Sequence, residues 1–208
     1  LKIHSMSDQV VYIVQNGINV ESIKELNSTD SSEREGIVSI RGLSQIYQID
    51  SILKARNSTP ELSDLPISLV YPFSHEEYAI KVRRLLVNGD KDLGRLHKNE
   101  LYELLAKSIL VVSIPMSDSS PRSVYESIFS GCAVAVLDNL YLANLPLCML
   151  KRVIIINLND SNWLFDAYRQ AELIVSEPYK PSIEALVQFD QVESMKKVLN
   201  LVNERKHG

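Results

Sequence analysis

The stretch that decides the fold is ILVVSIPMSDSSPRSVYESIFSGCAVAVL, residues Ile109–Leu137. It begins with an apolar run of strand type, Ile109–Ile114, passes through a polar turn into a segment of helical spacing, Ser123–Ser130, and returns to a second apolar run, Ala133–Leu137. Neither run alternates with polar residues, so both strands are expected to be buried on both faces of a sheet. The order strand, helix, strand predicts a βαβ unit with parallel strands.

The same alternation extends over the whole chain. Further apolar runs predict strands at Val10–Val14, Ile37–Ile40, Ile67–Tyr71 and Val153–Ile156. Helical spacing predicts helices at Leu43–Ala55, Glu76–Leu86, Lys98–Lys107, Asn162–Val175 and Ile183–Arg205. We therefore expect an α/β fold: a single Rossmann-like, doubly wound and mainly parallel sheet of about six strands, flanked by helices. One domain is expected over residues 1–208, with residues 1–20 leading into and forming the first strand and residues 181–208 forming a C-terminal helix.

Composition excludes several classes of protein. The 208 residues carry 22 Lys and Arg against 26 Asp and Glu, a formal charge of −4, which gives no reason to expect nucleic-acid binding. No apolar run reaches the length of a transmembrane helix and no signal peptide is visible, so a cytoplasmic location without a membrane segment is expected. The two cysteines show no disulfide framework, and the four histidines show no metal spacing. The chain begins with Leu1, which we interpret as the start of a fragment.

The turn after Ile109–Ile114 offers the most chemistry. In an open parallel sheet, ligands bind in the crevice beyond the carboxyl ends of the strands, where helix N-termini favour anions. Pro121 is expected in the first helical turn with Ser120 as the preceding cap, so amides near Arg122, Ser123 and Val124 would face that crevice.

Two carboxylates flank this helix start. Asp118 lies on the loop before it and Glu126 about one and a half turns into it, and a carboxylate can accept hydrogen bonds from two neighbouring sugar hydroxyls. A purely structural reading fits the spacing as well, since Ser123-x-x-Glu126 matches a capping box and Asp118 could cap the turn.

Three other turns are weaker candidates. Arg41–Gly42 follows Ile37–Ile40, where an arginine could bind a diphosphate and a glycine permits close approach of a ligand. Asp90-Lys91-Asp92 could hold a divalent cation, but the adjacent Asn88-Gly89 turn favours a solvated charged loop. Gly94-Arg95-Leu96 could pass near a base or a phosphate.

Taken together, four segments resemble one family. Ser117–Val134 is similar to its acid-x7-Glu signature and the strand that follows, and Glu100–Ser108 to the helix before it. Val11–Ile18 looks like the strand and Asn-Gly turn that open its C-terminal domains, and Ile40–Leu43 like its first phosphate-contacting turn. The chain thus resembles the C-terminal, donor nucleotide-sugar-binding domain of a GT-B glycosyltransferase of the retaining, glycogen-synthase-like superfamily (glycosyl transferases group 1).

The resemblance implies roles for the candidate residues. Glu126 would hold the ribose hydroxyls, Asp118 would lie beside the donor sugar, and Arg41 with the amides near Ser123 and Val124 would bind the diphosphate. The strand near Gly94 would lie beside the base. The resemblance implies no metal and no cofactor other than the donor substrate. The candidate catalytic residues are Asp118 and Glu126, and the candidate substrate-binding residues are Arg41, Gly42, Gly94, Arg95, Ser120, Arg122, Ser123 and Val124.

The function implied is a hexosyltransferase of polysaccharide biosynthesis that uses a nucleoside diphosphate sugar with retention. We expect the chain to be inactive alone, because its N-terminal acceptor-binding domain would be missing. One departure concerns catalysis, since Ile46 stands where the family often has a lysine. A degenerate nucleotide-binding module without turnover and a sugar-nucleotide epimerase of similar architecture remain the alternatives.

Overall fold

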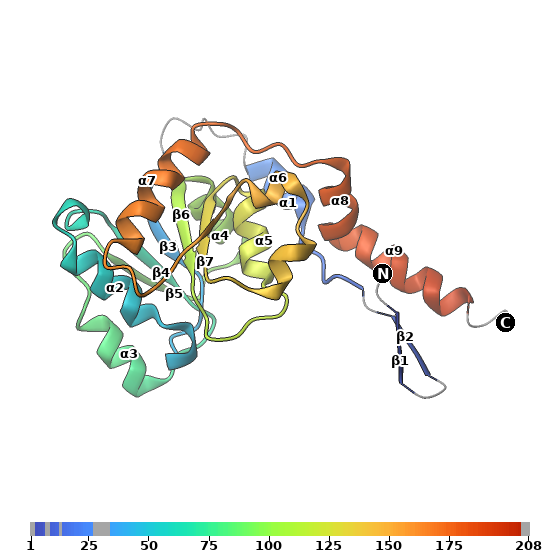
Figure 1. Ribbon diagram of the computed structural model, residues 1–208, viewed down its shortest axis with the longest axis horizontal. Coiled ribbons are helices and arrows are strands. Elements are labelled where there is room, and N and C mark those ends of the chain that lie inside the picture. Colours follow the sequence, from blue (N-terminus) through green and yellow to red (C-terminus); the bar gives the residue numbers. More distant parts are fainter. Residues whose placement is uncertain (1–2, 7–8, 13, 27–33, 205–208) are drawn as a thin grey trace.

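A six-stranded, fully parallel sheet forms the centre of the molecule (Figure 1). The computed structural model of the chain describes residues 3–6, 9–12, 14–26 and 34–204. In spatial order the strands are β5 (Lys91–Gly94), β4 (Ile67–Val70), β3 (Glu35–Ser39), β6 (Ser108–Ser113), β7 (Ala133–Val136) and β8 (Val153–Ile155). This is the doubly wound, Rossmann-like arrangement that the sequence predicted.

The winding reverses between β3 and β6. The chain runs from β3 outward through β4 to β5, then returns to the centre as β6 and runs the other way through β7 to β8. Val38 on β3 pairs with Val111 on β6 at this point. Crossovers on the two sides diverge here, which opens a crevice beyond the carboxyl ends of β3 and β6.

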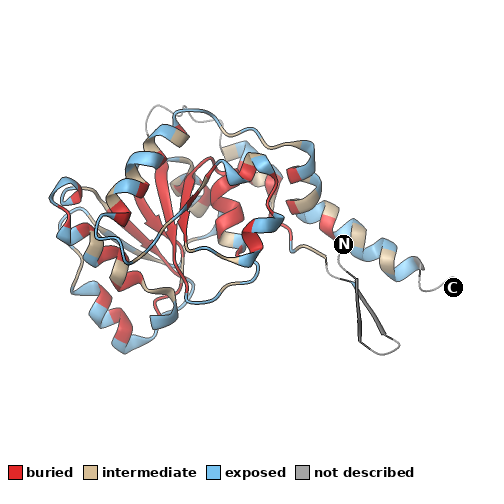
Figure 2. Ribbon diagram, viewed as in Figure 1, coloured by how far each residue is buried: buried red, intermediate tan, exposed pale blue. Residues whose placement is uncertain are grey.

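Helices cover both faces of the sheet, and the strands between them are buried (Figure 2). One face packs against α2 (Ile49–Ser58), α3 (Glu76–Arg83) and α7 (Trp163–Val175). The other packs against α1 (Val20–Leu26), α4 (Lys98–Ala106), α5 (Arg122–Phe129) and α8 (Ile183–Phe189). Neighbouring residues Ile37 and Val38 enter the two separate cores, as alternation along a strand requires.

Two strand predictions need correction. The run at Val10–Val14 does not join the main sheet: β2 (Gln9–Tyr12) pairs antiparallel with β1 (Ile3–Met6) in a separate hairpin. The sixth strand is instead β5, which begins inside the stretch Asp90-Lys91-Asp92 that was expected to be a loop. As an edge strand it has one neighbour and exposed polar residues, Lys91 and Asp92, so it carries no apolar run.

Two helix predictions are also altered. The helix expected at Leu43–Ala55 divides into a 3-10 turn, Gln45–Tyr47, and α2, because Gln48 between them has a left-handed backbone with φ of 53°. In the expected C-terminal helix, 181–208, the described residues 181–204 hold two helices rather than one, α8 and α9 (Gln191–Glu204), and 205–208 lie outside the described residues. The short helices α1 and α6 (Leu147–Leu150) were not predicted.

The junction between α8 and α9 is joined to the segment before α1. The Ile18 amide donates to the Phe189 carbonyl at 2.7 Å, and the Gln191 amide donates to the Ile18 carbonyl at 2.9 Å. A Cβ on Gly17 would lie 2.4 Å from the Gln191 Cα, so this close approach requires glycine. From the junction α9 extends away from the sheet (Figure 1).

The acidic stretch at Asp90 is structural. The Asp90 carboxylate is fully buried and forms an ion pair with the equally buried Arg56. It also accepts from the Ile67 amide at 2.9 Å and the Val87 amide at 2.8 Å. Asp92 accepts from Arg83 at 2.8 Å. The prediction of a solvated loop is therefore wrong, because Asp90 joins α2 to β4.

Candidate functional site

The crevice between β3 and β6 brings together two predicted residues that are 77 positions apart. Arg41 follows β3, Asp118 follows β6, and the Arg41 Nη2 lies 2.5 Å from the Asp118 Oδ2. Both side chains are largely buried, with exposed fractions of 13% and 15%. Arg41 also donates from Nε to the Ser113 Oγ at 2.8 Å, and its guanidinium lies 5.8 Å from the Tyr47 ring centroid.

These contacts fix the guanidinium but do not use all of its donors. Arginine has five N–H groups, and the hydrogen bonds made by Arg41 within the described residues come from Nε and Nη2. Its Nη1 is therefore available at the carboxyl end of the sheet. A planar guanidinium held in this way can bind a phosphate without first being ordered.

The start of α5 offers two further donors. Within the described chain, the amides of Arg122 and Ser123 donate to no acceptor, and the buried Ser123 Oγ has no partner. The Val124 amide donates to the Pro121 carbonyl at 2.9 Å, so in this part of the chain it is the Arg122 and Ser123 amides that have no acceptor. The N-cap is Pro121, one residue later than expected; the Ser120 Oγ accepts from Gln15 at 3.0 Å.

Glu126 does not close a capping box. Ser123 lies inside α5, and the Glu126 carboxylate points to α4. Its Oε1 accepts from the Lys98 Nζ at 2.5 Å and from the Tyr102 hydroxyl at 3.2 Å. Burial, followed by the charge of Glu126, raises the pKa of Tyr102, so the phenol stays protonated and donates. The structural explanation of the Ser123-x-x-Glu126 spacing therefore fails.

The electrostatic influence of the Arg41–Asp118 pair reaches two buried tyrosines beside α5. Burial is the main cause that raises the pKa of Tyr125 and of Tyr141, and the Asp118 charge raises both further while Arg41 opposes it. The two rings meet edge to face with centroids 6.3 Å apart. Both phenols are therefore neutral at physiological pH and add no charge beside the Arg41–Asp118 ion pair.

The remaining predicted residues follow the carboxyl ends of strands in the same sheet and make fewer contacts. Gly94 ends β5 with φ of +63° and open space where a Cβ would lie, and Arg95 after it is exposed. Gly42 follows Arg41, but a Cβ there would lie 2.5 Å from the Phe73 ring. That close contact with Phe73 favours a glycine at this position. Arg122 is the first residue of α5, and its side chain is exposed.

Sequence reasoning missed Lys98, Tyr102 and Ser113. The first two are four residues apart and so share one face of a helix, a local signal that was present in the sequence. Their target Glu126 is 28 residues from Lys98, and only the packing of α4 against α5 brings the groups together. Ser113 is the last residue of a buried strand and gave no signal of its own.

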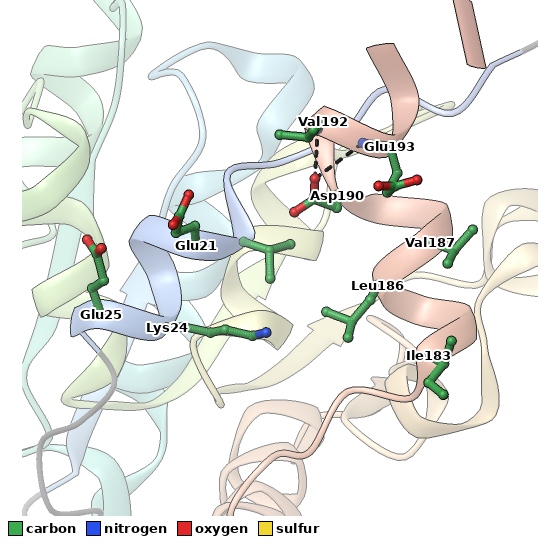
Figure 3. Close-up of a pocket in the computed structure, with 10 residues that line it drawn as sticks. Glu21, Lys24, Glu25, Ile183, Leu186, Val187, Asp190, Val192 and Glu193 are labelled. Atoms are coloured by element: carbon green, nitrogen blue, oxygen red, sulfur yellow. Dashed lines mark hydrogen bonds between the residues drawn. The ribbon is translucent and has the colours of Figure 1, made fainter. Parts of the chain in front are cut away.

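A groove elsewhere on the molecule suits a diphosphate poorly (Figure 3). It has a volume of about 710 Å³ and lies between α1 and the α8–α9 junction, with Leu186 and Val187 among its apolar residues. Its carboxylates outnumber its single cation, Lys24; they come from Glu21, Glu25, Asp190 and Glu193. Such a lining repels phosphate groups.

A second hollow of about 680 Å³ lies between α6 and the end of α7. Arg152 lines it, but its donors bind the carbonyls of Gly131, Ile174 and Glu177. Cys148 lines it too and contacts the Ser182 hydroxyl at 3.3 Å. These polar groups are already used to hold the chain.

Neither a metal cluster nor a membrane span is found in the part of the chain that the structure describes. No three His, Cys, Asp or Glu side chains there gather as metal ligands. No helix within that part is both long and apolar enough to cross a bilayer.

Comparison with known proteins gives matches by structure alone. No protein-family model matches the chain, and no curated protein sequence does. Among solved structures, HepE of Anabaena in complex with UDP and glucose has a TM-score of 0.69 at 15% identity, over 93% of this chain and 57% of that one. A glycosyltransferase of Rickettsia africae has a TM-score of 0.68 at 14% identity, over 93% and 56%. AviGT4, a glycosyltransferase of avilamycin A biosynthesis, gives 0.63 at 13%, over 94% and 58%.

The chain therefore spans just over half the length of these proteins. Its six-stranded parallel sheet flanked by helices matches a half-domain of these structures and is consistent with the C-terminal half. The chain has the fold of a GT-B glycosyltransferase half-domain.

Proposed function

We propose that the chain is the donor half of a retaining hexosyltransferase and binds a nucleoside diphosphate sugar beyond the carboxyl ends of β3 and β6. The observation that carries the proposal is the set of donors left available there. Arg41 is fixed by Ser113 and Asp118 with Nη1 unused, and within the described residues two amides at the start of α5 have no acceptor. Support also comes from the fold, since HepE has this fold and was solved with UDP and with UDP-glucose.

In this proposal each group acts on a separate part of the donor. The Arg41 guanidinium and the amides of Arg122 and Ser123 bind the diphosphate. They stabilise the negative charge that grows on it as the bond to the sugar breaks, and no metal is required. Glu126 accepts from ribose hydroxyls, and Asp118, next to Arg41, lies beside the sugar. The acceptor comes from a second domain, so the chain alone transfers nothing.

Titration calorimetry with UDP, GDP, ADP and CDP tests the proposal. We expect one of them to bind, and Glu126→Ala to weaken that binding by about 1–3 kcal/mol, the scale of a lost hydrogen bond to a charged group. The exposed Glu172, which pairs with Arg169 on α7, provides the control variant Glu172→Ala. Absence of binding to all four diphosphates, or unchanged affinity in Glu126→Ala, contradicts the proposal.

One observation favours a second candidate, a nucleotide-binding module without turnover. Ile46, where related enzymes often carry a lysine, is 43% exposed and supplies no charge. Arg41 would then be the main cation at the diphosphate, and its charge is already partly neutralised by Asp118. Binding of UDP-glucose by the chain, with no sugar transfer after an acceptor domain of a related enzyme is fused to it, would favour the module over the transferase.

A further inference from the structure

We propose that Lys98 and Tyr102 are positioning residues that hold Glu126 by one carboxylate oxygen and so present the other to the ribose hydroxyls. The inference rests on the proposed function, because it assigns the partners of the carboxylate that binds the ribose. It adds two residues on α4 to the candidate site residues.

The two donors converge on one atom. Lys98 and Tyr102 both donate to the Glu126 Oε1, at 2.5 Å and 3.2 Å. The Oε2 accepts no hydrogen bond from any residue that the structure describes. Because the Glu126 side chain is only 4% exposed, its orientation is set by these contacts rather than by solvent.

The helix geometry supports a directed contact. Lys98 and Tyr102 are one helical turn apart on α4, and the Lys98 ammonium lies 5.5 Å from the Tyr102 ring centroid. Lys98 is 59% exposed, so it reaches the carboxylate from the solvent side, at the edge of the sheet where α4 begins. Tyr102 is buried beneath it. The carboxylate is therefore restrained from two directions.

A similar cluster on the opposite face of the sheet shows what a purely structural arrangement looks like. Asp50 also binds lysines and a tyrosine, but through both oxygens. Its Oδ2 contacts Lys54 and Lys81, each at 2.8 Å, and its Oδ1 accepts from the Tyr78 hydroxyl at 2.7 Å. That carboxylate is fully used within the protein, whereas Glu126 keeps one oxygen for a further donor.

The experiment compares UDP with 2′,3′-dideoxy-UDP, which lacks both ribose hydroxyls, by titration calorimetry. If UDP does not bind and GDP does, the guanosine pair replaces it. The wild-type chain should bind the hydroxylated ligand about tenfold or more tightly, the scale of hydrogen bonds to a charged group. Lys98→Met and Tyr102→Phe should each bring this ratio below about threefold while leaving the dideoxy affinity within about twofold. Lys98→Arg should restore most of the ratio.

Lys54→Met and Tyr78→Phe are the matched controls, since they make equivalent changes around Asp50 and should keep the wild-type ratio. A wild-type ratio retained in Lys98→Met and Tyr102→Phe overturns the inference alone. An equal loss of both affinities also overturns it, because it indicates a structural role. A wild-type chain that binds none of the diphosphates, or shows a ratio of one, contradicts the proposed function as well. Melting temperatures confirm that each variant is folded.

Discussion

Two arginine–aspartate pairs, Arg56–Asp90 and Arg41–Asp118, differ in how many of their hydrogen-bonding groups have partners within the protein. Asp90 is buried with Arg56, and both of its oxygens are occupied, with backbone amides of Ile67 and Val87 completing the set. Arg56 itself also donates to the Leu65 carbonyl at 3.0 Å. Arg41 and Asp118 are also mostly buried, yet the guanidinium keeps unused donors at the crevice.

The difference shows how a structural pair can be told from a binding pair. Buried polar groups normally find partners, so a fixed guanidinium with spare donors at the end of the sheet is the feature on which the proposed binding site rests. Four tests can break this comparison or sharpen it.

The largest effect is expected at the satisfied pair. Asp90→Ala leaves the Arg56 charge buried without a counter-charge and should lower the free energy of unfolding by about 3–5 kcal/mol. For a chain of this size that corresponds to a fall in melting temperature of about 10 °C. Thermal and urea unfolding measure it.

Asp92→Ala is its control, because Asp92 pairs with Arg83, whose side chain is 48% exposed. Such a pair contributes about 1 kcal/mol or less. An equal loss of unfolding free energy in Asp90→Ala and Asp92→Ala would show that burial does not decide how much each pair contributes to stability.

At the unsatisfied pair the effect should fall on binding. Arg41→Ala removes the cation of the proposed diphosphate site and should weaken UDP binding by about 1.5–3 kcal/mol, or roughly 10- to 150-fold. Calorimetry measures the affinity, with Arg83→Ala as the control, because Arg83 pairs with Asp92 and has no role in the proposed site. Unchanged UDP affinity in Arg41→Ala would make this pair structural too.

The carboxylate of Asp50 extends the comparison, because its contribution to stability should depend on pH. Burial would raise the pKa of Asp50, but hydrogen bonds from Lys54, Lys81 and Tyr78 outweigh it and hold this pKa below its ordinary value. A depressed pKa contributes stability that is complete above about pH 4 and is lost as the pH falls toward the folded-state value. Asp50→Asn should therefore cost about 1–2 kcal/mol at pH 7 and less at pH 3. Urea unfolding at both values checks the trend; a gap that widens at pH 3 would contradict it.

The smallest effect is expected from Asp118→Asn. In the proposed site, Asp118 competes with the diphosphate for Arg41, so its neutralisation should strengthen UDP binding about two- to fivefold, the scale of one weak ion pair. The unfolding free energy should change little. A marked loss of UDP affinity would mean that Asp118 orients Arg41 more than it competes.

The sequence predicted the centre of the fold better than its edges. Buried central strands such as β6 and β7 are continuous apolar runs, so they stand out. The edge strand β5 does not, because Lys91 and Asp92 face solvent. The apolar run Val10–Val14 was assigned to the wrong sheet, because an apolar run predicts a strand but not which strand it pairs with.

The site shows the same division. Arg41 and Asp118 could be predicted because each follows a strand, and parallel strands place their carboxyl ends together. Their direct pairing, and the pairing of Glu126 with Lys98, depend on helix and loop packing over long sequence separations. The start of α5 was predicted one residue too early, with Ser120 rather than Pro121 as the N-cap, and such a shift decides which amides remain without an acceptor.

The contact of Ile18 with the α8–α9 junction has a mechanical consequence. Two backbone hydrogen bonds attach the segment before α1 to the point where α9 departs, and Gly17 lets the backbones touch. A pull on α9 is thus transmitted to the residues around Ile18 without first passing through the sheet. Because Gln15 in this segment also donates to the Ser120 Oγ just before α5, a displacement of α9 would be passed on to the loop that leads into α5.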